Sequence, residues 1–195
     1  ECLRSASYAA RLAKGLEDKS QLYRARVLEG VALSELGRFA EATVAHVEGW
    51  SLARVMDDVQ REIWAIGNLG ALCFGMGQWS AAIRYFEKAR SMAEEYGFAD
   101  LEFHSRTNLA DCAVQLRDPV GGLAALSQFR TETPETRPQM SVSANGLNTL
   151  SRLHLLAGNL DAARIHAGES SRLARTARLE KIAPNSEAVL SLIDV

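Results

Sequence analysis

The stretch "GMGQWSAAIRYFEKA", residues 75–89, decides the fold, because it holds the end of one helix, a tight turn and the start of the next. Gly77 stands where a helix ends at a residue that tolerates positive φ. Upstream, residues 59–76 place apolar side chains at three- and four-residue steps, the period of an amphipathic helix. The sequence therefore predicts two antiparallel helices joined at Gly77.

The same pattern recurs elsewhere in the chain. "ELGRFAEATVAHVEG", residues 35–49, lies about 40 residues earlier and "LAGNLDAARIHAGES", residues 156–170, about 80 residues later, which is typical of a stacked helical array. Four units can be aligned on a residue in the turn. In each unit a small residue stands seven positions before the turn residue and another stands five positions after it. The turn residues are Gly37, Gly77, Arg117 and Gly158, the earlier small residues are Gly30, Gly70, Ala110 and Ser151, and the later ones are Ala42, Ala82, Gly122 and Ala163.

This order of residues resembles the tetratricopeptide repeat. The family's basic repeat has about 34 residues, and the units here are about six residues longer. They are similar to the long subclass in kinesin light chains, spindle-orientation adaptors and bacterial regulators that carry DNA-binding or nucleotide-cyclase domains. The resemblance implies an all-α, right-handed superhelical solenoid of antiparallel helical hairpins, with about ten helices.

We expect one array over residues 1–195. Its first two predicted helices span 21–36 and 38–57, and the next three span 59–76, 79–96 and 100–116. The third unit departs from the pattern, because Gly-Gly and two prolines predict a short second helix and an irregular loop over 131–138. The predicted divisions are a half-repeat at 1–18, repeats at 19–58, 59–98, 99–138 and 139–179, and a half-repeat at 180–195.

The two half-repeats and the absence of an initial Met lead us to expect a fragment of a larger protein. The 195 residues carry a net charge of only -2 and are 47% apolar, as in a soluble globular chain. Cys2, Cys73 and Cys112 are widely spaced, which favours reduced thiols and a cytoplasmic location. The uncharged stretch 63–83 contains Asn, Gln and Ser, so we expect no membrane-spanning helix.

No catalytic, cofactor or metal motif is evident, and we predict that the chain is not an enzyme. The four histidines form no i, i+4 pair with a suitably placed acid, and the cysteines lack metal-ligand spacing. The segment "GMGQWS", residues 75–80, lacks the lysine and the preceding strand of a phosphate-binding loop. His46 occupies a core position of the repeat, so we expect it in the interior.

The resemblance also implies a binding surface, because the first helices of this family line a concave groove that receives partner segments. Matching positions in the first unit include Leu28 and Val31. Asn68 and Asn108 are equivalent, and a carboxamide offers the donor and acceptor that an extended peptide backbone needs. The alternative is that these asparagines only hydrate an open surface. The predicted partner-binding residues are Arg24, Trp64, Asn68, His104, Asn108, Asp111, Asn145, Asn148 and Arg152.

Three functions remain as hypotheses. The first is a non-catalytic protein- or peptide-binding module of a larger, bacterial, regulatory or signalling protein. The second is a homo-oligomerisation scaffold, with a homodimer formed through apolar residues of the half-repeats such as Leu12 and Val189. The third is a nucleic-acid-binding regulator that uses Arg172, Arg175 and Arg178 on one side of a helix. Without net positive charge or stacking aromatics, we do not expect nucleic acid as a partner.

Overall fold

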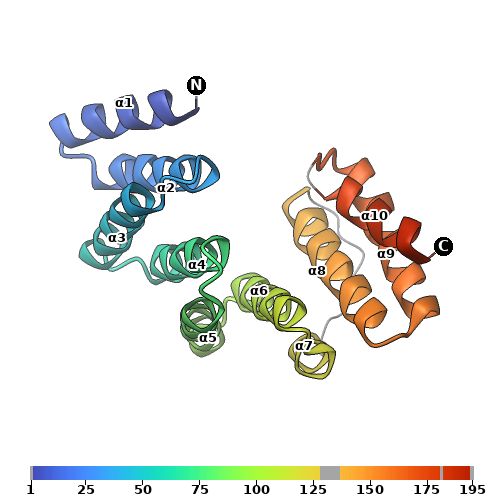
Figure 1. Ribbon diagram of the computed structural model, residues 1–195. Coiled ribbons are helices and arrows are strands. Elements are labelled where there is room, and N and C mark those ends of the chain that lie inside the picture. Colours follow the sequence, from blue (N-terminus) through green and yellow to red (C-terminus); the bar gives the residue numbers. More distant parts are fainter. Residues whose placement is uncertain (1, 128–136, 181, 194–195) are drawn as a thin grey trace. The chain divides into compact units, whose positions relative to one another are not determined.

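The computed structural model describes residues 2–127, 137–180 and 182–193, and every regular element in these ranges is a helix (Figure 1). The predicted helix bounds between residues 21 and 116 agree with the structure to within two residues. The all-α prediction is therefore confirmed. The helices are α1 (Cys2–Gly15), α2 (Lys19–Glu35), α3 (Phe39–Val55), α4 (Val59–Gly75), α5 (Trp79–Glu95), α6 (Ala99–Leu116), α7 (Pro119–Ala125), α8 (Arg137–Leu156), α9 (Leu160–Thr176) and α10 (Ala183–Ile193).

The chain divides into two compact units. Unit 1 runs to Ser105 and contains α1 to α5 with the start of α6, whereas unit 2 begins at Arg106 and contains the rest of α6 with α7 to α10. In unit 1 each helix from α1 to α5 packs against the next one along the chain, and α2 also contacts α4. In unit 2, α9 lies against both α8 and α10.

The turns between paired helices share one geometry. Gly37, Gly77, Arg117 and Gly158 have φ values of 71°, 72°, 57° and 76°. After each of them, the next amide donates to a carbonyl five residues earlier; for example, Gln78 N donates to Cys73 O at 2.9 Å. This bond closes the helix end in the manner of a Schellman motif. The four aligned turn residues thus share one backbone conformation, including the unit with arginine in the glycine position.

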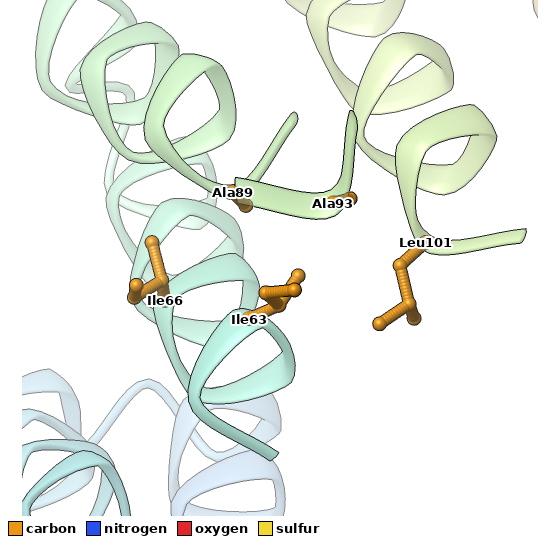
Figure 2. Packing of buried hydrophobic residues seen from close by; sticks show 5 residues of the cluster. All are labelled: Ile63, Ile66, Ala89, Ala93 and Leu101. Carbon is orange, nitrogen blue, oxygen red and sulfur yellow. The ribbon is translucent and has the colours of Figure 1, made fainter. Parts of the chain in front are cut away.

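The centre of unit 1 is an apolar cluster between three helices. Ile63 and Ile66 of α4 face Ala89 and Ala93 of α5, and Leu101 of α6 closes the cluster (Figure 2). All five side chains are buried. The two alanines leave room for the isoleucines, so α4 and α5 pack closely and the start of α6 is fixed against both of them.

Glycines in the first helices admit rings from the second helices. A Cβ at Gly30 would lie 2.5 Å from Cε1 of His46, and a Cβ at Gly70 would lie 2.6 Å from Cε1 of Phe86. Each ring therefore occupies the volume that any larger residue would need at these positions. His46 is buried, as expected, and its Nδ1 atom has no hydrogen-bond partner among the described residues.

The third hairpin differs from the others. Its second helix, α7, has 7 residues, whereas α3, α5 and α9 have 17 each, which confirms the predicted short helix. Residues 131–136 of the predicted loop lie outside the described residues. The prediction that this loop extends to Pro138 is wrong, because α8 already begins at Arg137. A proline is compatible with the first turn of a helix, where its missing amide hydrogen has no helical partner to lose.

The buried imidazole makes stability depend on pH. Burial lowers the pKa of His46, so the folded chain resists protonation that the unfolded chain accepts near pH 6.5. Stability should therefore fall as the pH falls below that value. We expect His46→Phe, which copies Phe86, to raise the free energy of unfolding by about 1 kcal/mol by removing the unpaired nitrogen. It should also reduce the loss of stability between pH 7 and 5, as measured by urea denaturation.

Phe86→His is the reciprocal control for His46→Phe. It places an imidazole over Gly70 and should lower stability and steepen the pH dependence. Equal pH profiles for the wild type and both variants would contradict this account of the buried ring.

Candidate functional site

Each first helix in unit 1 leaves one stripe of side chains uncovered. On α2 the exposed residues follow three- and four-residue steps through Arg24, Leu28 and Val31, and the remaining sides of the helix are packed. On α4 the corresponding stripe contains exposed Trp64 and Ala71 with half-buried Asn68 between them. We define the unit-1 face as Arg24, Leu28, Val31, Trp64, Asn68, Ala71 and His104.

The helices α2 and α4 lie in parallel with matching register. Near their starts, the hydroxyl of Tyr23 donates to the carbonyl oxygen of Arg61 at 3.0 Å, and near their ends Leu33 and Leu72 share a buried cluster. Arg24 follows Tyr23 directly, and Trp64 lies about one turn after Arg61. The arginine and the tryptophan therefore occupy neighbouring places on the unit-1 face.

An aromatic pair lies on the same face. The rings of Trp64 and His104 have centroids 5.2 Å apart and are inclined by 46°. Burial lowers the pKa of His104, so its imidazole is neutral at neutral pH. Asn68, one helical turn from Trp64, makes no hydrogen bond to the described part of the chain. The face thus combines an exposed aromatic surface with an unpaired carboxamide.

Unit 2 contains the remaining predicted residues, and an ion pair joins two of them. Nη1 of Arg152 on α8 donates to Oδ1 of Asp111 on α6 at 3.1 Å, and the Thr149 hydroxyl donates to the same oxygen at 3.0 Å. Burial raises the pKa of Asp111, and Arg152 opposes that rise. Asn108 is half-buried and Asn145 is exposed on the same two helices.

Asn148 lies apart from the other predicted residues. Its side chain is only 7% exposed, and its Oδ1 accepts a hydrogen bond from the Ser186 hydroxyl of α10 at 3.3 Å. When the units are aligned on Gly70, Ala110 and Ser151, the residue equivalent to Asn68 and Asn108 is Thr149. Asn148 therefore joins α8 to α10 instead of facing outward, and we leave it out of the proposed site.

The ion pair between Asp111 and Arg152 was not predicted from the sequence. The two residues occupy equivalent positions in adjacent units, and their opposite charges were the available signal. In a solenoid, equivalent positions of adjacent units become neighbours across the first helices. A comparison of charge at equivalent positions would have predicted this pair.

The described residues contain no cluster of three potential metal ligands. His154 and His166 stack with ring centroids 5.3 Å apart, but they bring no acid or thiol into such a group. Among the arginines of the nucleic-acid hypothesis, Arg175 pairs with Glu187 at 2.6 Å, whereas Arg172 and Arg178 are exposed. No helix in the described ranges is both long and apolar enough to cross a membrane.

Comparison with known proteins identifies the repeat. Residues 63–96 match the family model of the tetratricopeptide repeat, which confirms the predicted resemblance. The fold is similar to BtubC (BKLC) from P. vanneervenii, with 16% identity, a TM-score of 0.68, and coverage of 99% of this chain and 88% of that one. It is also similar to a Rap protein complexed with Competence and Sporulation Factor, with 14% identity, a TM-score of 0.60, and coverage of 98% and 58%. No curated protein matches the chain.

The pair Asp111–Arg152 should stabilise the contact between α6 and α8. We expect Arg152→Gln to lower the free energy of unfolding of the wild type more than that of the Asp111→Asn variant. The difference should be on the order of 1 kcal/mol, because both side chains are about two-thirds shielded from water. Urea denaturation of the four chains of this double-mutant cycle measures the difference. A coupling energy of zero would show that the pair contributes nothing to the fold.

Proposed function

Because residues 63–96 form a tetratricopeptide repeat and the chain has a helical-repeat fold of this kind, we propose that it is a non-catalytic module that binds a segment of another protein. The binding surface in unit 1 is the unit-1 face. A separate candidate surface in unit 2 comprises Asn108, Asp111, Asn145 and Arg152. We further propose that the module belongs to a larger regulatory or signalling protein of bacteria, as the sequence resemblance implies, and that it lies in the cytoplasm, as the widely spaced cysteines indicate.

The observation that carries this proposal is the uncovered stripe of α2 and α4. Trp64 is 42% exposed, although burial of its ring would be favourable, and Asn68 beside it has no intramolecular partner among the described residues. An extended segment would cover the ring and form backbone hydrogen bonds with the carboxamide. A surface that only needed hydration would gain nothing from an exposed tryptophan.

The structure of the Rap protein adds support, because that protein was solved with a bound factor. The likeness in fold extends over 98% of this chain, and by analogy we propose that its first helices also receive a partner segment. The wider role in regulation rests on the resemblance alone, and the binding of a protein segment is the part that the unit-1 face supports directly.

Binding is tested with a library of random 12-residue peptides displayed on phage and selected on the immobilised full chain. Enriched peptides are then synthesised and titrated by tryptophan fluorescence. We expect Asn68→Ala to weaken peptides that bind unit 1, and Asn108→Ala to weaken peptides that bind unit 2, by about 1 kcal/mol, or roughly fivefold, because each variant loses backbone hydrogen bonds to its peptide. Thermal melting should be unchanged, since neither carboxamide bonds within the described chain.

The matched control for these variants is a double variant of two exposed arginines, Arg172→Ala on α9 and Arg178→Ala in the turn that follows it. Arg175 is spared, because it pairs with Glu187. Peptide affinity should stay the same in this double variant. If affinity falls only in the arginine variant, the outer side of α9 is the binding surface and the proposal is wrong.

A second candidate, self-association, is favoured by α1. Tyr8 and Leu12 on this helix and Leu16 directly after it are at least half exposed, and together they offer an apolar surface to a second copy. Val189 does not contribute as predicted from sequence, because it is buried within unit 2.

Sedimentation velocity over a range of concentrations tests self-association. We expect a dimer in the wild type and a weaker one after Leu12→Ser and Leu16→Ser. A monomer at all concentrations would exclude this second candidate.

A further inference from the structure

The unit-1 face has an apolar centre. Leu28 and Val31 on α2 are 54% and 42% exposed, and the equivalent positions on the neighbouring α4 are Asn68 and Ala71, with Trp64 one turn before Asn68. Across this centre no side chain is charged. A partner segment therefore favours an aliphatic or aromatic side chain here, since in the proposed function Asn68 already bonds the backbone of the segment and leaves a polar side chain without a partner.

Arg24 lies at the end of this centre near the start of α2, and Glu35 lies at the other end, one turn beyond Val31. Arg24 is exposed, and it forms no ion pair or hydrogen bond with the described residues. Its neighbours at three- and four-residue steps on α2 are Ser20, Gln21, Val27 and Leu28, none of which is acidic. On the unit-1 face the guanidinium therefore has no intramolecular counter-charge.

Arg26, two residues further along α2, shows the contrast. Its guanidinium pairs with Glu29 and with Glu48 of α3, both at 2.6 Å. That arginine is used in joining two helices. Arg24 belongs to the same helix and points to the other side, so its charge is available to a ligand.

We propose that the unit-1 face selects an extended segment with an acidic side chain that pairs with Arg24 and a neighbouring aliphatic or aromatic side chain that packs on Leu28, Val31 and Trp64. This inference rests on the proposed function, in which Asn68 holds the backbone of the segment. The guanidinium binds a carboxylate through two parallel hydrogen bonds. A single arginine balances the one negative charge of Asp or Glu, so a carboxylate suits this place better than a doubly charged phosphate.

The spacing of the two side chains follows from the helices. Packed helices have axes about 8–10 Å apart, and an extended chain advances about 3.1–3.3 Å per residue. A segment that crosses from α2 to α4 therefore places the acidic residue about three residues from the side chain that covers Trp64. A segment with polyproline geometry returns to the same side after three residues, which suits this spacing.

The test is a charge reversal followed by peptide selection. The same phage library of 12-residue peptides, displayed so that no peptide has a free carboxyl terminus, is selected in parallel on the wild-type chain, Arg24→Glu and Arg54→Glu. Arg54 is an exposed arginine on α3 that does not belong to the unit-1 face, and it serves as the matched control. Thermal melting of all three chains checks that folding is unchanged.

We expect the wild type and Arg54→Glu to enrich peptides with Asp or Glu about three residues from an apolar residue. Arg24→Glu should instead enrich Lys or Arg at that place. For a selected peptide, replacing its acidic residue with the matching amide should weaken binding to the wild type about tenfold and leave binding to Arg24→Gln unchanged.

The outcomes separate this inference from the proposed function. Peptides that bind the wild type, weaken with Asn68→Ala, and show no acidic preference would overturn the selection by Arg24 and leave the proposed function intact. An acidic preference that persists in Arg24→Glu would do the same. If no peptide is enriched on the wild type, both proposals are wrong.

Discussion

The close approach of the two helices in each hairpin is the constraint on which the rest of the structure depends. A ring from the second helix occupies the place of a side chain at Gly30 and again at Gly70. Because a Cβ at either position would overlap the ring, the helices could not keep both a larger residue and their present spacing. This contact fixes which side of each first helix is buried, and so which side is left for partners.

The exposed stripe on α2 and α4 follows from that packing. Once the second helices cover the glycine side of each first helix, and α2 meets α4 along its flank, only one line of side chains remains in contact with water. Apart from the contact of Trp64 with His104, the residues on this line do not take part in the packing of α2 against α4, so they can differ between units. Arg24 and Trp64 occupy equivalent positions, yet one is charged and the other aromatic. We expect such differences on a surface where each unit contacts a different residue of the ligand.

Unit 2 uses the same positions differently. Asp111 and Arg152 pair across α6 and α8, and Thr149, in the position of Asn68, donates to Asp111. These contacts tie first helices together beside the shortened α7. In unit 2, side chains at the positions that we propose for ligand binding in unit 1 are thus bonded to other residues of the chain. The unit-1 face is accordingly the stronger candidate for ligand recognition.

The helices and their pairing could be predicted from the amino-acid sequence alone. Turn residues such as Gly77, small residues such as Gly70 and the spacing of apolar side chains act within one hairpin, so their effect is visible from local order. The sequence also indicated the outward residues of α2 and α4. The burial of Asn148 could be learned only from the tertiary structure. This residue lies one position from the outward stripe and is buried against Ser186. The tertiary structure likewise decided that Asp111 is bound by Arg152, because partners from distant helices set the environment of a charge.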